Sequence, residues 1–184
     1  MAPLGSAYGE RAGNVVVGVS DSLAGLAALR RGVREARATG RTLVAVRAWE
    51  PPEGEALYAR RPETSWARLW ADEARRCLER AFDLALGGPP ADLRIVRRVI
   101  RGRAGPVLCS VAASADDLLV IGMARRRGPL ARLRPRPVHR FVPARAACEV
   151  LIVAGPRLLP QEARMLRRGA GAAVPARTGS GRSR

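Results

Sequence analysis

The sequence contains no lysine, and every one of its 33 basic side chains is an arginine. This absence excludes Schiff-base catalysis by lysine and the phosphate-binding lysines of P-loop NTPases and protein kinases. Histidine occurs once, at His139, and no carboxylate stands near it in the sequence to orient it as an acid or base. One histidine and three widely spaced cysteines provide neither metal-ligand spacing nor a disulfide framework. We therefore expect no catalytic residue, no bound metal and no enzymatic activity.

Long apolar runs and glycine-rich phosphate motifs are missing too. No apolar run approaches the roughly 18 residues of a membrane span, and the N-terminus lacks the pattern of a signal peptide. We therefore expect a cytoplasmic chain without a membrane partner. Neither a Walker A sequence nor G-x-G-x-x-G occurs. Aromatic residues make up only 4% of the chain, so no stacking platform for nucleic acid is expected.

What the chain has in excess is positive charge, with a formal net charge of +17. Such a surface attracts polyphosphate or nucleic acid without sequence specificity, and the attraction falls steeply with salt. Residues 155–184 carry seven arginines against one acidic residue, and they are interpreted as a basic, disordered tail. Residues 1–13 are interpreted as a flexible lead-in, which leaves 14–154 as the folded domain.

Strand and helix patterns alternate through that domain. Apolar runs predict strands at 14–19, 42–49, 93–100, 116–122 and 149–155. Helical spacing predicts helices at 23–40, 63–88 and 105–115, with Trp66, Trp70, Cys77, Leu78, Ala81 and Leu84 as the apolar stripe of the second. This alternation predicts an α/β fold with a Rossmann-like, open, five-stranded parallel sheet covered by helices on both faces. The arginines within 93–100 are typical of an edge strand.

The chain resembles the universal stress protein family over residues 14–154. The resemblance rests on "VVVGVSDSLAGLAALRRGVREA", "LVAVRAWEPP", "RGRAGPVLCSVAASADDLLVIG" and "ARAACEVLIVAG", in this order and at suitable spacing. It implies strand order 3-2-1-4-5 and a homodimer formed through the last strand. ATP-binding members of the family carry an aspartate at the end of the first strand and G-x2-G-x9-G-[S/T] after the fourth.

The sequence departs from that nucleotide-binding pattern at several points. Ser20 stands at the aspartate position, and Asp21 follows one residue later. Arg125 replaces the second glycine, and Arg136 with Pro137 replaces the final glycine and hydroxyl residue. An arginine Cβ restricts positive φ and blocks close approach of the backbone to a phosphate. The positions that would contact a nucleotide, were binding retained, are Ser20, Ala48, Ile121, Gly122, Arg125, Arg136 and Val138.

These departures predict a non-catalytic stress-response protein with a degenerate nucleotide-binding loop, and no cofactor is certain. One alternative is a member that still binds ATP and acts as a nucleotide-dependent switch or weak ATPase. The second alternative is a non-specific binder of nucleic acid or another polyanion. All three depend on one spatial expectation, that residues 20 and 122 face each other where the first and fourth strands end.

Overall fold

The computed structural model describes residues 13–60, 62–123 and 138–156. Its strands are β1 (Val15–Gly18), β2 (Leu43–Trp49), β3 (Ile95–Arg101), β4 (Leu118–Met123) and β5 (Glu149–Ala154). Its helices are α1 (Leu23–Thr39), α2 (Glu55–Tyr58), α3 (Thr64–Leu86), α4 (Ala104–Val111) and α5 (Val138–Phe141), followed by the 3₁₀ turn η2 (Val142–Ala144). The predicted lead-in 1–13, apart from Gly13, lies outside the described residues, as does the predicted tail beyond residue 156.

The five strands form one sheet in the order β3-β2-β1-β4-β5, and every pairing is parallel. The predicted fold class and strand order are therefore confirmed. The first and fourth strands are neighbours, with Gly18 in register with Ile121. β3 lies at one edge, as predicted, and its Arg97 and Arg98 are exposed.

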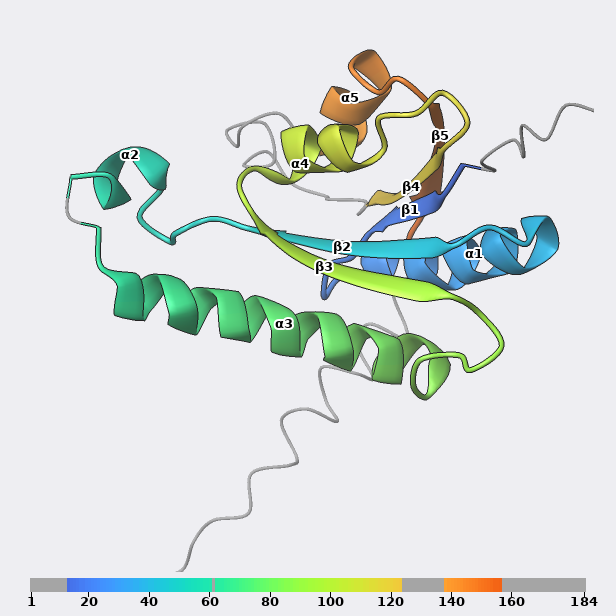
Figure 1. Ribbon diagram of the computed structural model, residues 1–184, viewed down its shortest axis with the longest axis horizontal. Helices are drawn as coiled ribbons and strands as arrows, with labels where there is room; N and C mark the ends of the chain where they lie inside the picture. The colour runs from blue at the N-terminus through green and yellow to red at the C-terminus, as the bar shows by residue number, and fades with distance from the viewer. Residues whose placement is uncertain (1–12, 61, 124–137, 157–184) are drawn as a thin grey trace, which may run out of the picture.

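Helices cover both faces of the sheet (Figure 1). Alternate residues of β1 point to opposite faces, as strand geometry requires. Val15, Val17 and Val19 belong to a buried cluster with residues of α1 and α3. Val16 belongs to a second buried cluster on the other face, with residues of α4 and η2. The sheet is thus the middle of three layers, and its inner strands are apolar on both sides.

Local polar groups fix the ends of two elements. The backbone N–H of Gly25 donates to Ser22 Oγ at 3.1 Å, so Ser22 is the N-cap of α1, while Gly40 ends the helix at φ +65°. Asp117 is 95% buried, and its carboxylate accepts from the backbone N–H groups of Asn14, at 2.7 Å, and Ser114, at 3.2 Å. Asp117 therefore ties the start of β4 to the start of β1.

Three details of the helices differ from the sequence predictions. The four-residue α2 was not predicted, and α4 ends at Val111 instead of 115. Trp66 and Leu84 were assigned to the buried stripe of α3, but they are 50% and 67% exposed. The buried face of α3 runs through Ala81, Phe82 and Ala85, and Leu84 lies at the margin of that face. Trp66 lies in the first turn, which runs past the sheet toward α2 (Figure 1). Among the described residues, no helix is long and apolar enough to cross a membrane.

Candidate functional site

The predicted cleft lies where β1 and β4 end, beside the first turn of α1. Gly25 of that turn packs against Ser20, since a Cβ at Gly25 would meet Ser20 Oγ at 2.3 Å. Gly122 packs against the same turn, where a Cβ would meet the carbonyl oxygen of Ala24 at 2.4 Å. Ser20 and Gly122 therefore approach the same turn of α1, which agrees with the spatial expectation from the sequence. The backbone of Gly122 packs directly on the backbone of Ala24 and Gly25, so the packing of the fold itself requires glycine at position 122.

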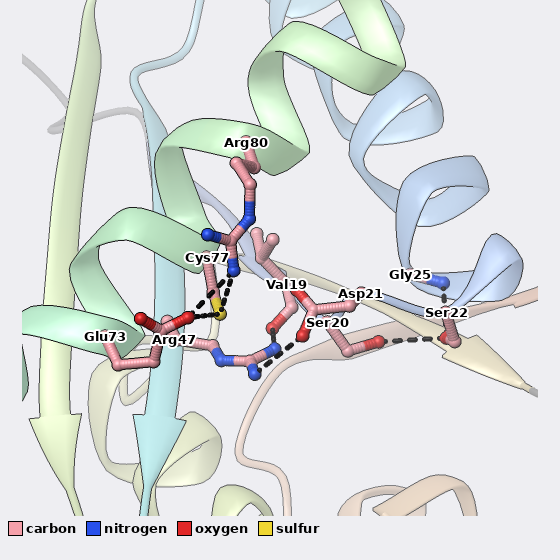
Figure 2. A network of polar contacts seen from close by, with 9 residues as sticks. All are labelled: Val19, Ser20, Asp21, Ser22, Gly25, Arg47, Glu73, Cys77 and Arg80. Atoms are coloured by element: carbon pink, nitrogen blue, oxygen red, sulfur yellow. Dashed lines mark hydrogen bonds and ion pairs between the residues drawn. The ribbon is translucent and has the colours of Figure 1, made fainter. Parts of the chain in front are cut away.

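The hydroxyl and carboxylate groups at the end of β1 already have partners, which Figure 2 draws. Ser20 Oγ and Ser22 Oγ share a hydrogen bond of 3.0 Å. Asp21 Oδ2 lies 3.1 Å from Nη2 of Arg47, which is the fifth residue of β2. Nη1 of the same guanidinium donates to the carbonyl oxygen of Val19 at 3.4 Å. Arg47 thus holds both the backbone and the one carboxylate at the end of β1.

The Arg47–Asp21 pair lies on the α3 side of the sheet. The charges of Asp21 and Arg47 both act on the thiol of Cys77 in α3, and Figure 2 shows the three residues together. Burial is the largest cause that raises the pKa of Cys77 above its ordinary value, followed by the charge of Asp21. A raised pKa keeps the thiol protonated at neutral pH, so Cys77 is not an activated nucleophile.

Glu73 and Arg80 extend this polar group along α3. Glu73 accepts from Arg80 Nη2 at 2.9 Å, from Arg76 Nε at 3.1 Å and from the Cys77 thiol at 3.5 Å. These hydrogen bonds, that of Arg80 foremost, lower the pKa of Glu73 from 4.5 to about 2. Glu73 is therefore ionised at neutral pH and is unsuited to act as a proton donor.

The apolar wall of the predicted site lies on the other face. Ile121 is fully buried in the cluster with α4, and Ala48 and Val138 pack against that cluster. Three of the seven predicted positions therefore belong to one apolar cluster on the α4 side of the sheet. Arg125 and Arg136 lie outside the described residues, as do all of residues 124–137.

An aromatic cluster that was not predicted from the sequence lies at the far end of the same sheet edge, and we call it the aromatic corner. It comprises Trp49, Tyr58, Trp66 and Trp70, with ring centroids 5.8–6.3 Å from Trp70. The guanidinium of Arg101 lies 4.4 Å from the centroid of Tyr58 and 5.7 Å from that of Trp49. A hollow of about 480 Å³ opens beside these rings. One signal was present in the sequence: all three tryptophans fall between residues 49 and 70.

Comparison with known proteins gives one family. The model described as "Universal stress protein family" matches residues 12–154. A search of curated proteins found no match.

Three solved structures that match the chain illustrate the comparison with known folds. The universal stress protein UspA from Lactobacillus plantarum is 18% identical with a TM-score of 0.55, over 78% of this chain and 98% of that one. The hypothetical protein MJ0577 is 12% identical with a TM-score of 0.57, over 80% and 99%. A universal stress protein solved in complex with cAMP is 25% identical with a TM-score of 0.47, over 78% and 98%.

Proposed function

The chain belongs to the universal stress protein family, and we propose that it is a non-catalytic member whose nucleotide cleft has lost the specific contacts that hold ATP. In this role it acts through binding and partner contacts. The proposal concerns the cleft beside the ends of β1 and β4, because the resemblance implies the nucleotide site of the family there.

The observation that carries this proposal is the position of Asp21. The resemblance implies a carboxylate at the end of β1 that holds a nucleotide, and Asp21 is the nearest one to that position. Its carboxylate pairs with Arg47 on the α3 side, whereas the apolar wall of Ala48, Ile121 and Val138 packs on the α4 side. For the Asp21 carboxylate to reach a ligand at that wall, its ion pair with Arg47 would have to break. The half-buried Arg47 would then be left without its partner.

The other retained elements have structural explanations. Gly122 matches the first glycine of the family pattern, but its packing against the Ala24 carbonyl demands glycine with or without a ligand. Ser20 stands in place of the family aspartate and shares its hydroxyl with Ser22. A serine hydroxyl also binds a ribose more weakly than a charged carboxylate does.

A second candidate function is an ATP-dependent switch. It is favoured by the apolar cluster on the α4 side of the sheet, because Ile121 belongs to it and Ala48 and Val138 pack against it. In that case the arginines after β4 replace the backbone contacts to the phosphates.

Calorimetric titration of ATP at about 150 mM salt separates the two functions. We expect weak heats that fade as salt rises and that are equal for ATP and GTP, because only charge attraction remains. A saturable one-to-one complex selective for adenine contradicts the first proposal. In that case Ala48→Leu, which narrows the wall, should weaken the complex, and Ala113→Leu, at an exposed position, should leave it unchanged.

We further propose that the chain forms a homodimer through β5. Within the described residues, this strand pairs on one side only, with β4, and its Ile152 is 39% exposed. Light scattering should therefore give twice the chain mass of 19.7 kDa. A monomeric mass contradicts this assignment.

A further inference from the structure

The hollow at the aromatic corner lies beyond the ends of β2 and β3, away from the ends of β1 and β4. Its volume of about 480 Å³ falls within the roughly 300–1,000 Å³ typical of small-molecule sites. The lining residues are Pro52, Glu53, Tyr58, Glu63, Trp66 and Trp70. The hollow thus combines aromatic walls with two carboxylates.

Local contacts hold these walls in place without a ligand. Tyr58 is 94% buried, and its hydroxyl donates to the backbone carbonyl of Glu63 at 2.7 Å. The rings of Trp66 and Trp70 are stacked, with centroids 6.1 Å apart and planes inclined by 29°. A site whose rings are already positioned loses little freedom when a ligand enters.

Carboxylates line the hollow, although the chain as a whole carries a net charge of +17. Of the four glutamates in residues 50–63, Glu50 and Glu55 pair with Arg103 and Arg101. Glu53 and Glu63 both line the hollow. Phosphate-bearing ligands would be repelled by these carboxylates, whereas a cation would be attracted.

The aromatic corner already accommodates one organic cation. The guanidinium of Arg101 lies over the ring of Tyr58 at 4.4 Å, and its Nε and Nη2 donate to Glu55 at 3.0 and 2.7 Å. Rings that face a weakly hydrated cation, with a carboxylate completing its hydrogen bonds, are a recurrent arrangement for recognising such groups. The hollow offers the same two components beside Arg101, in Trp66 and Trp70 with Glu53 and Glu63.

We propose that this hollow binds a small, weakly hydrated organic cation of the alkylguanidinium or quaternary ammonium class. The indole rings of Trp66 and Trp70 contact the apolar surface of the cation, and Glu53 and Glu63 balance its charge. This site is separate from the ends of β1 and β4, so cation binding at the hollow does not depend on whether the protein binds ATP.

Tryptophan fluorescence provides a direct test, because all three tryptophans of the chain belong to the aromatic corner. The probe is methylguanidinium chloride, compared at equal ionic strength with sodium chloride and with methylurea, its uncharged counterpart. We expect saturable binding of methylguanidinium with a Kd on the order of 1 mM and no saturable response to methylurea.

Variants then assign the binding to this hollow. Glu53→Gln combined with Glu63→Gln should weaken binding about tenfold, since two charges are removed without loss of shape. Trp66→Ala, at a half-exposed position, should weaken it about fivefold. Glu149→Gln removes an exposed charge from β5 and should leave the affinity unchanged. Circular dichroism confirms that each variant is folded.

Three results would overturn the proposal. An equal response to methylurea and methylguanidinium, or an unchanged affinity in the double glutamine variant, means that the hollow does not recognise cations. Alternatively, the double variant changes the fluorescence of the free protein while methylguanidinium has no effect. That combination means that an arginine of the chain itself occupies the hollow.

Discussion

Two regions of opposite construction lie along the same carboxyl edge of the sheet. Where β1 and β4 end, small residues let Ser20 and Gly122 contact the first turn of α1 at backbone distance. Where β2 and β3 end, Trp49 is in register with Arg101, and large rings pack against one another beside a hollow. Small residues give close packing, whereas flat rings at angles to one another leave space.

This contrast predicts different responses to substitution. Backbone that touches backbone has no freedom to move aside, so the β1–β4 end should tolerate almost no added atom. Removing a ring from the rim of the aromatic corner should cost little stability, whereas removing its central ring should cost more. Four predictions follow this order, from the largest effect to the smallest.

Gly122→Ala should give the largest effect. The added Cβ would meet the Ala24 carbonyl oxygen at 2.4 Å and the Gly25 nitrogen at 2.8 Å, which forces β4 and α1 apart. We expect a loss of about 3 kcal/mol in the free energy of unfolding and a Tm lower by roughly 10 °C. Gly40→Ala is the matched control, with open space but φ +65°, and it should cost only about 1 kcal/mol. Equal losses would mean that backbone strain, not close packing, sets the cost.

Trp70→Ala should have the next largest effect. Trp70 contacts the rings of Trp49, Tyr58 and Trp66, so its removal leaves a cavity at the centre of the aromatic corner. We expect about 2 kcal/mol in urea unfolding followed by circular dichroism, against less than about 1 kcal/mol for the half-exposed Trp66→Ala. If both variants lose the same stability, Trp70 is not the central ring of the aromatic corner. The two regions would then differ less in their response to substitution than we expect.

The two regions also differ in how much of each could be predicted from the sequence. The residues of the β1–β4 end stand directly beside two apolar runs of the sequence. Because parallel strands align their carboxyl ends, the strand order alone was enough to predict that Ser20 lies near Gly122. The aromatic corner draws Trp49, Tyr58 and Trp70 from three elements, one of which is the unpredicted α2. Trp66 was predicted to be buried because helical spacing indicates only which residues share a face of a helix. That spacing does not record that the first turn of α3 extends beyond the sheet.

Asp21→Asn tests the ion pair that closes the β1–β4 end. Arg47 is only 21% exposed, so its guanidinium would keep its charge in a half-buried position after losing the carboxylate of Asp21. We expect a loss of about 1 kcal/mol in urea unfolding at low salt. Asp92→Asn is the control, because it breaks a pair with Arg37 in which both side chains are about half exposed, and it should cost clearly less stability than Asp21→Asn. A cost no larger than that of the control would contradict the role given to Arg47.

The smallest effect is the acid response of Glu73, whose carboxylate lies on α3 between the two regions. Hydrogen bonds from Arg80, Arg76 and Cys77 hold its pKa at about 2 in the folded chain, below the ordinary 4.5 expected after unfolding. Its stabilising contribution is therefore complete above pH 4.5 and is lost as the pH falls toward about 2. In Glu73→Gln this part of the acid dependence should disappear, so the stabilities of the two proteins converge between those pH values.

NMR titration of the Glu73 carboxyl carbon measures the same pKa directly. Arg80→Gln should raise it more than Arg76→Gln, because the hydrogen bond from Arg80 is the largest cause of the lowering. Added salt should also raise it, because the carboxylate and its arginine partners are about half exposed and are screened by ions. A Glu73 pKa near 4.5 would show that these arginines do not hold the carboxylate in solution. The polar group along α3 would then be only a set of solvated charges.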